Sequence, residues 1–505
     1  MDFKQIYTKD DFVKFLKGFL PDDFEVDQEE LTSDHSFKFV EKVAKLGECK
    51  SLDLKIYEID HKSENDPRVT LSKEAFRLMR SYASRRSLII FKNPKTRNYR
   101  LSLITFQTSW DEGKKIKTEY SNPRRFSFYL GPDARTKTPE KFLVKLGKAK
   151  DFDDLVSRFS VEVVNKDFYQ DIAIFFNRLT GGDIKISTKV QHFEPEMTLP
   201  SIDKEDKKTY QEFAVRLIGR IIFCWFLKQK KSSDGISLMP DEFVSTKAVR
   251  NNENYYHSIL EKIFFEVLNR PKNQRKPGLV NGFDKIPYLN GGLFDPHYDD
   301  FYENQPNWAL KAPDNWFGDL FEILETYNFT IDENTVMDVD LSIDPEMLGR
   351  IFENLLAEIN PETGESARKS TGSYYTPRSI VEYMVDQSLV QYLIAKTQIN
   401  EKKINALVSL DESDDSEYPL AQGEKERVVE ALNEVKIIDP ACGSGAFPIG
   451  ILQKIVWILG RVDSDGKLWF EKKTENIDPL LKADFKKKFA NENFDYIRKT
   501  GVIRD

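Results

Sequence analysis

The stretch Val435–Leu459, VKIIDPACGSGAFPIGILQKIVWIL, decides the fold expected for the C-terminal part of the chain. Its first four residues, VKII, have the composition of a short buried strand, which Asp439-Pro440 ends. A loop of small residues follows at Ala441–Ala446, and Ile449–Leu459 carries the apolar stripe of a helix. A strand, a glycine-rich turn and a helix in this order are typical of the ligand-binding edge of a doubly wound α/β sheet.

The loop has its own chemistry. Gly443 and Gly445 can adopt a positive φ and let a ligand approach the backbone closely. The N-terminus of the following helix offers free N–H groups to a carboxylate or hydroxyl. The GxxxxGK[ST] spacing of a phosphate loop is missing, and Pro448 stands where a dinucleotide fingerprint needs its third glycine. Both of these nucleotide-binding motifs are therefore excluded.

The complete string DPACGSGAF resembles motif I of amino-type DNA methyltransferases, specifically the N6-adenine class. In that family the loop wraps the methionine part of S-adenosylmethionine. The resemblance implies that the following residues bind this cofactor: Asp439, Pro440, Ala441, Cys442, Gly443, Ser444, Gly445 and Phe447. The alternative is a tight strand–helix turn without a ligand.

A second stretch, Ser373–Leu389 (SYYTPRSIVEYMVDQSL), lies some 60 residues before the loop. Thr376 can cap a helix whose first residue is Pro377. The stretch is similar to motif X of the same family, whose Tyr-Thr-Pro turn lies against the cofactor. This implies Tyr375, Thr376 and Pro377 as further cofactor-binding residues. The predicted apolar face of the helix consists of Ile380, Val381, Met384, Val385 and Leu389.

The resemblance covers essentially the whole chain. Three other stretches resemble the large single-chain restriction–modification methyltransferases of type IIG-like architecture: NPRRFSFYLGPDARTKTPEKF (122–142), LNGGLF (289–294) and PEMLGRIFENLLAEI (345–359). The family's catalytic Asn/Asp-Pro-Pro-Tyr/Phe tetrapeptide, which holds the flipped adenine, does not occur in the chain. The catalytic residues are therefore unknown. We expect the N-terminal portion of a longer enzyme, inactive by itself and incomplete at its C-terminus, where the catalytic and target-recognition region would follow.

Composition excludes several other classes of protein. The 505 residues carry a net charge of −8, with 40% hydrophobic and 31% charged residues, as in a globular protein. Cys49, Cys224 and Cys442 are too far apart for a disulfide framework or a CxxC metal site, and the five histidines are equally scattered, so no metal site is predicted from them. No run of 18 apolar residues and no signal peptide is visible, which makes the cytoplasm the default location.

Charge is unevenly distributed along the chain. Between His61 and Lys150 there are 22 Lys/Arg and 8 Asp/Glu, a net charge of +14, which leaves −22 for the rest. Such a segment is a candidate surface for an anionic polymer, and double-stranded DNA is the expected partner. The alternative is an ordinary solvated basic face.

The expected architecture is multidomain, with α/β parts and a helical part. Three domains are expected. Residues 1–150 are expected to form an α/β domain and 151–360 a mostly helical connector or DNA clamp, and the resemblance implies that 361–505 are the start of a class I, Rossmann-like methyltransferase domain. Tyr210–Gln229 is apolar nearly all round and is predicted to be a buried central helix. The predicted strands of the first domain are Leu52–Ile59, Ser87–Phe91, Tyr99–Phe106 and Phe126–Leu130.

The N-terminal domain raises a second chemistry. In type IIG enzymes such a domain is often a PD-(D/E)XK nuclease, which needs two acids and a lysine around Mg²⁺. The candidates here are Asp53 and Glu58, but Asp60 occupies the lysine position and Lys62 lies two residues further on. An active nuclease that uses Mg²⁺, a degenerate nuclease-like fold and an unrelated fold all remain open.

The resemblance predicts a site-specific DNA adenine-N6 methyltransferase of a restriction–modification or phage-defence system, with S-adenosyl-L-methionine as cofactor. Two alternatives are a non-catalytic DNA-binding module, which would use the basic segment, and a Mg²⁺-dependent type IIG endonuclease subunit, which would use Asp53 and Glu58.

Overall fold

The computed structural model divides the chain into two compact units, Met1–Gly372 and Ser373–Asp505, each described here by itself. The first unit contains both predicted N-terminal domains, and the border between them at residue 150 stays a prediction. The described residues are 1–31, 37, 39–62, 68–109, 119–186, 189–199, 206–232, 235–279, 282–289, 292–297, 300, 310–330, 338–344, 347, 349, 355, 376, 378–409, 419–440, 442, 445–463 and 466–474.

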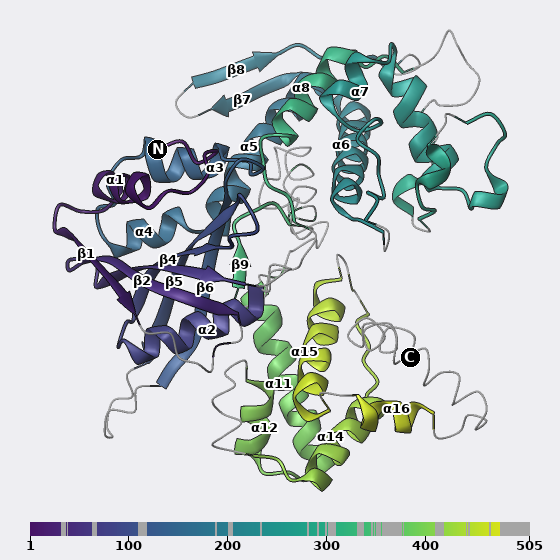
Figure 1. The fold of residues 1–505 in the computed structure, drawn as a ribbon. Coiled ribbons are helices and arrows are strands. Elements are labelled where there is room, and N and C mark those ends of the chain that lie inside the picture. Colours follow the sequence, from purple (N-terminus) through teal and green to yellow (C-terminus); the bar gives the residue numbers. More distant parts are fainter. Residues whose placement is uncertain are drawn as a thin grey trace. The chain divides into compact units, whose positions relative to one another are not determined.

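A mixed seven-stranded sheet organises the start of the first unit, with the order β1-β2-β3-β4-β5-β6-β9 (Figure 1). Its strands are β1 (Phe24–Leu31), β2 (Val40–Cys49), β3 (Leu54–His61), β4 (Arg86–Lys92), β5 (Tyr99–Ser109), β6 (Glu119–Leu130) and β9 (Asp338–Asp340). The pairs β3–β4 and β6–β9 are parallel, and the other neighbours are antiparallel. The predicted mixed α/β character of the chain is confirmed.

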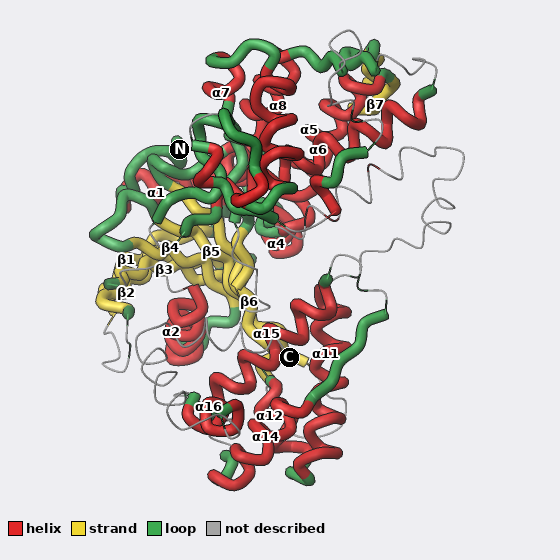
Figure 2. Tube along the Cα trace, turned by 90° about the vertical axis from the view of Figure 1, so that its right-hand side faces the viewer, coloured by secondary structure: helices red, strands yellow, loops and turns green. Residues whose placement is uncertain are grey.

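Helices α1 (Lys9–Phe19) and α2 (Arg68–Ser81) lie on opposite sides of this sheet (Figure 2). Because side chains alternate along a strand, Leu54 and Ile56 of β3 point to one face and join the core that also contains the apolar residues of α1. On the other face, Arg125 of β6 is fully buried. It donates from Nε to Ser102 Oγ at 3.0 Å and from Nη1 to Ser72 Oγ of α2 at 3.2 Å, which ties α2 to the sheet.

The rest of the first unit is mostly helical. Its helices and hairpin strands are α3 (Lys137–Pro139), α4 (Phe152–Arg158), α5 (Val161–Thr180), β7 (Gly182–Ile186), β8 (Lys189–Phe193), α6 (Lys207–Gln229), α7 (Thr246–Arg250) and α8 (Asp314–Leu324). Short helical turns lie at Glu140–Lys145, Tyr256–Leu260, Lys262–Leu268, Lys272–Gln274, Phe283–Lys285 and Gly292–Phe294. The prediction that α6 is a buried central helix is confirmed, because buried residues lie on all its sides between Tyr210 and Phe226.

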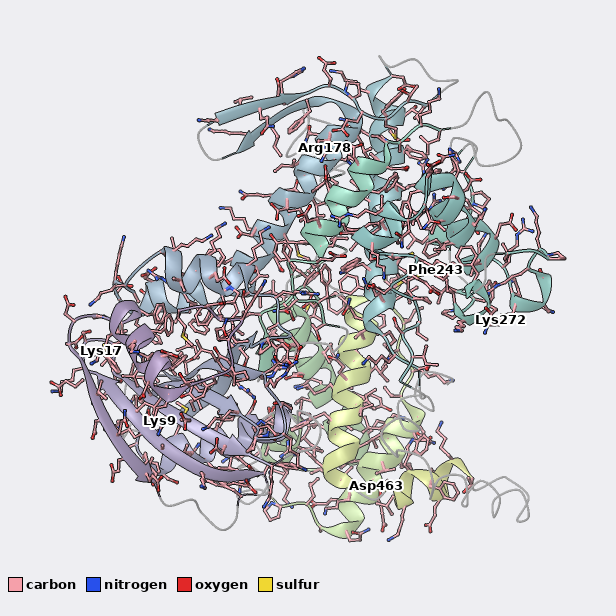
Figure 3. The ribbon with its side chains drawn as sticks, turned by 45° about the horizontal axis from the view of Figure 1, so that its top comes forward. Lys9, Lys17, Arg178, Phe243, Lys272 and Asp463 are labelled. Atoms are coloured by element: carbon pink, nitrogen blue, oxygen red, sulfur yellow. The ribbon has the colours of Figure 1, made fainter. Side chains whose placement is uncertain are left out.

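Paired charges are buried within this helical part. Arg220 of α6 donates from Nη1 and Nη2 to the two carboxylate oxygens of Asp300, both at 3.0 Å, and neither residue is exposed. Arg178 of α5, labelled in Figure 3, pairs with Glu196 at 2.6 Å and with Asp319 of α8 at 2.9 Å. These ion pairs link α6 to Asp300, and α5 both to α8 and to the segment that follows β8.

The second unit contains only helices among its described residues: α11 (Arg378–Thr397), α12 (Glu401–Val408), α14 (Gln422–Glu434), α15 (Ala446–Val462) and α16 (Lys467–Lys473). Its core is formed by the facing sides of α11, α12, α14 and α15. None of the described helices in the chain is long and apolar enough to cross a membrane.

The predicted strand Val435–Ile438 is not formed. These residues are irregular, and 48% of Ile437 and 89% of Ile438 are exposed. A strand needs a neighbour to satisfy its backbone groups, and the described residues of this unit offer none. The prediction from composition was wrong because it rested on apolar side chains alone.

Candidate functional site

The glycine-rich loop leads directly into α15. Gly445 is the N-cap of this helix, with φ = 81°, a left-handed conformation that favours glycine. Its N–H donates to the carbonyl oxygen of Cys442 at 2.7 Å, and its own carbonyl accepts from Ile449 N–H at 3.0 Å. Apart from its chain neighbours and the backbone of α15, no heavy atom of the described residues lies within 4 Å of the position that a Cβ would take at Gly445. The turn is therefore tight but open on the side where a ligand would approach.

Helices α11 and α15 run side by side in the same direction. A Cβ at Gly450 would lie 3.0 Å from Val381 Cγ1, so the two backbones approach closely near their first turns. One turn further along, Lys454 Nζ of α15 lies 2.8 Å from Asp386 Oδ1 of α11. The contact of Gly450 with Val381 comes first along both helices, and the contact of Lys454 with Asp386 comes second along both. The two helices are therefore parallel. Both N-termini, with their positive dipole ends, therefore lie at the same end of the second unit.

The Lys454–Asp386 pair is largely buried. Lys454 also donates to the carbonyl oxygen of Val408 at 3.2 Å. Burial raises the pKa of the Asp386 carboxyl above its ordinary value, and the nearby Lys454 offsets this only in part. The pair thus fixes the alignment of the two helices, although it adds little net electrostatic stability.

The predicted cofactor-binding residues lie at this end of the unit as far as they are described. Thr376 precedes α11, and Asp439, Pro440, Cys442, Gly445 and Phe447 surround the start of α15. Thr376, Asp439 and Phe447 are half-buried, while Pro440 and Cys442 are exposed. Tyr375, Pro377, Ala441, Gly443 and Ser444 lie outside the described residues.

Apolar side chains are exposed on α11 and beside the loop. Val381, Val385 and Leu389 are buried as predicted, but Ile380 and Met384 are exposed, so the predicted apolar face is wrong for these two residues. The reason is that they turn away from α15, whose contact uses the Val381 side of the helix. Further exposed apolar residues of the second unit are Tyr383, Ile437, Ile438 and Ile449.

A second candidate site lies in the first unit at the carboxyl ends of the parallel strands β3 and β4. The strand register places Asp60 opposite Lys92. Lys92 Nζ lies 3.0 Å from Glu58 Oε1 and 3.1 Å from Asp60 Oδ1. Glu58 and Asp60 are two residues apart and so point to the same face of the sheet. We name Tyr7, Lys9, Glu58, Asp60 and Lys92 the carboxylate–lysine cluster.

The N-terminal segment completes this cluster. The Tyr7 hydroxyl donates a hydrogen bond to Glu58 Oε2, and Lys9 Nζ of α1 lies 3.9 Å from Glu58 Oε1 (Lys9 is labelled in Figure 3). Only 7% of the Glu58 side chain is exposed, compared with 31% of Lys92. Burial lowers the pKa of Lys92, but its bonds to Glu58 and Asp60 outweigh this effect and raise the pKa above its ordinary value. Lys92 is therefore a charged ammonium at neutral pH.

The predicted nuclease candidates Asp53 and Glu58 are not brought together. Asp53 lies in the turn before β3, with φ = 48°, and Lys62 is exposed beyond the other end of that strand. Five residues of extended chain separate Asp53 from Glu58 by about 16 Å. Sequence reasoning missed Lys92, whose only signal is its place at the end of the neighbouring strand.

Two oxygen donors suit magnesium, which often takes one or two carboxylates and completes its shell with water and substrate phosphates. No group of three or more His, Cys, Asp or Glu residues that could hold a metal occurs among the described residues. Glu58 and Asp60 therefore fit a magnesium ion only as part of a site that a phosphate completes.

The basic segment is less cationic in the structure than in the sequence. Several of its lysines and arginines pair with carboxylates that lie outside residues 61–150. These pairs are Lys92 with Glu58 and Asp60, Arg100 with Asp340, Lys137 with Asp171, Lys141 with Asp167, and Lys148 with Asp22. The net charge of +14 thus overstates the positive surface that is available to DNA.

Comparison with known proteins gives two matches. A sequence family described as "Domain of unknown function (DUF7814)" matches residues 181–305. A curated protein of Methanocaldococcus jannaschii, named "Putative type II restriction enzyme and methyltransferase", is 32% identical over 276 residues, which are 52% of this chain and 22% of the relative. The match thus spans about a fifth of the relative's length. No solved structure matches.

Proposed function

We propose that this chain belongs to a DNA-modifying enzyme of a restriction–modification system, which transfers a methyl group from S-adenosylmethionine to the amino nitrogen of adenine. The relative with both activities in its name supports the restriction–modification context. The observation that carries the methyltransferase role is the left-handed Gly445 at the start of α15, open toward solvent and next to the N-terminus of the parallel α11.

The residues at this end fit the methionine part of the cofactor. A carboxylate is favoured near helix N-termini, where free N–H groups and the positive dipole end are available. Thr376, Asp439 and Gly445 would hold the cofactor, which supplies an activated methyl group when bound. The chain's contribution is to orient that group toward an adenine turned out of the duplex. Double-stranded DNA is the proposed partner.

The test is a measurement of N6-methyladenine in the DNA of host cells that express the protein from its complete reading frame. We expect N6-methyladenine at one sequence motif with the wild-type protein and none with an Asp439→Ala/Gly445→Val double variant. Equal background levels in both strains would contradict the proposal and would favour a non-catalytic DNA-binding module.

A second candidate function, a magnesium-dependent endonuclease, is favoured by the carboxylate–lysine cluster. Glu58 and Asp60 are the oxygen ligands that the chain offers, and Lys92 provides an ammonium group 3.0 Å from Glu58 and 3.1 Å from Asp60. Magnesium, when bound, would polarise a phosphodiester and activate water. Lys92 would hold the phosphate through its charge, and Glu58 and Asp60 would balance the charge of the cation.

Nicking of supercoiled plasmid in the presence of Mg²⁺ tests this second function. We expect Glu58→Gln and Lys92→Met to lower the nicking rate by at least about 100-fold. Asp53→Asn is the matched control, because Asp53 lies in a turn away from the cluster, and it should retain the wild-type rate. Equal nicking by wild type and Glu58→Gln would remove the endonuclease role.

A further inference from the structure

In the carboxylate–lysine cluster, the groups that a divalent cation would bind already have partners within the cluster. Glu58 and Asp60 carry two negative charges, and Lys9 and Lys92 carry two positive charges, so the cluster is neutral as a whole. Lys92 contacts both carboxylates, and Tyr7 occupies the second oxygen of Glu58. A divalent cation that enters must therefore displace Lys92 and break the Tyr7 hydrogen bond, which lowers its affinity.

Tyr7 is fixed in place by its surroundings. Its ring packs edge-on against Tyr99, with ring centroids 5.3 Å apart, and in a tilted arrangement against Phe12 at 5.7 Å. The preceding segment is anchored, because Phe3 is fully buried and its carbonyl accepts from Gly131 N–H at 2.9 Å. Burial, and then the bond to Glu58, raises the pKa of Tyr7 well above its ordinary value, so the phenol remains a donor at neutral pH.

The two lysines can exchange partners. They are more accessible than the carboxylates, with 37% of the Lys9 side chain and 31% of Lys92 exposed, compared with 7% of Glu58 and 21% of Asp60. Each ammonium is a point charge on a flexible stem, and phosphate oxygens are an alternative partner of the same charge as a carboxylate. When a phosphodiester takes up Lys9 and Lys92, the carboxylates lose their counterions and the site becomes net negative. A cation then gains affinity.

We propose that Tyr7, Lys9 and Lys92 keep the carboxylate pair Glu58 and Asp60 closed to divalent cations until a phosphodiester backbone takes up the two lysines. The inference rests on the second candidate function, whose site it regulates. DNA and the metal ion bind cooperatively in this scheme, and linkage requires that each raises the affinity for the other by the same factor. The protein thereby avoids holding a reactive metal ion without its substrate.

Binding of Mn²⁺ to the full chain, followed by electron paramagnetic resonance of the free ion, tests this coupling with and without a short duplex DNA. In the wild-type protein we expect DNA to raise the Glu58-dependent affinity by about ten-fold, within the usual range of coupling. A Tyr7→Phe/Lys9→Met double variant keeps the ring packing and should bind Mn²⁺ about ten-fold more tightly without DNA. Lys92 still contacts both carboxylates in this variant, so DNA should still raise the affinity, but by less than in the wild type.

Two controls make the outcomes separable. Lys14→Met removes the same charge from α1 at an exposed position, where Lys14 pairs only with Asp11 among the described residues, and it should bind Mn²⁺ as the wild type does. Glu58→Gln defines the signal that belongs to the site. If Glu58-dependent binding exists but the double variant and DNA leave it unchanged, the closure is wrong and the metal site stands. If no Glu58-dependent binding occurs under any condition, the metal site and the closure both fail.

Discussion

The two candidate sites differ in how far their residues are exposed to solvent. In the carboxylate–lysine cluster of the first unit, each charged group has a partner of opposite charge within 3.9 Å, and Glu58 is nearly inaccessible. In the second unit, the loop that precedes α15 stands beside the exposed Ile437 and Ile438, whose composition is that of a buried strand. The exposed loop site is thus marked by consecutive residues that form a sequence motif. The paired carboxylate–lysine cluster is formed by residues that are scattered along the chain.

The two sites differ in whether the amino-acid sequence alone can reveal them. A loop motif describes how the backbone must turn for a ligand, which is a local property of consecutive residues. A paired cluster depends on which strand ends become neighbours, which is a property of the sheet. The following predictions test whether the first unit depends on its buried pairs and whether the second unit carries its function in the loop.

The largest expected effect is on the stability of the first unit. Asp300→Ala would leave the buried guanidinium of Arg220 without its carboxylate, at a cost of about 3–5 kcal/mol in the free energy of unfolding. The matched change in the second unit is Asp386→Ala. The Asp386 carboxyl has a raised pKa and is partly exposed. It should cost clearly less. Urea denaturation of the two variants gives both values, and equal losses would contradict the contrast.

Next in size is the effect of Gly445→Val on methylation. A β-branched residue is strongly disfavoured at φ = 81°, so the loop must change its shape. We expect methylation by the protein from its complete reading frame to fall by at least about 100-fold, with a melting temperature within a few degrees of wild type. Gly423→Val is the control. A Cβ added at Gly423 also meets open space, but the φ angle of Gly423 is not in the left-handed region. Methylation at the wild-type rate by Gly445→Val would make the loop an ordinary turn.

A smaller effect is the pH dependence contributed by His257 of the first unit. Burial lowers its pKa, but bonds to Glu261 and the Leu310 carbonyl outweigh burial and raise it above the ordinary value. A raised pKa means that the folded state holds the proton more tightly. The resulting stability is fully present below about pH 6.5 and is lost as the pH rises through the folded-state pKa. Thermal melts of wild type and His257→Gln should differ by about 2 °C at pH 6 and converge at pH 9. A constant difference would show that His257 acts through packing alone.

The smallest effect is expected at the exposed end of the unformed strand. Ile438→Lys should change the stability of this chain by less than about 0.5 kcal/mol, because the side chain already lies in water. Ile458→Ala, at a fully buried position of α15, should cost about 2–5 kcal/mol in the same unit. A large loss from Ile438→Lys would mean that Val435–Ile438 is paired in solution.

Much of the sheet could be predicted from sequence. Strands β3, β4 and β5 lie where their sequence patterns placed them, and α6 is buried as its all-round apolar surface indicated. Strands β1 and β2 were missed. Strand β1 gives no alternating apolar pattern, because it is almost wholly exposed and carries charged residues on both faces. The strand Val435–Ile438 was predicted wrongly, since pairing is not encoded in the strand itself.

The candidate sites could be predicted only in part. The loop residues Asp439–Phe447 stood out because the string DPACGSGAF resembles motif I of amino-type DNA methyltransferases. Of the cluster, Glu58 was identified as a candidate, but Lys92 could not be assigned before the parallel pairing of β3 and β4 was known. The positive charge of residues 61–150 was overestimated because its partners, such as Asp340 and Asp171, are distant in sequence.

The most direct test of the central claim is photochemical crosslinking of methyl-labelled S-adenosylmethionine to the protein expressed from its complete reading frame. Trypsin would release the loop as the single peptide Ile437–Lys454, because Lys436 and Lys454 flank it. We predict that this peptide carries the label, and that S-adenosylhomocysteine and Gly445→Val each abolish it. A competed label found only in other peptides, with none in Ile437–Lys454, would contradict the assignment of the loop as the cofactor site.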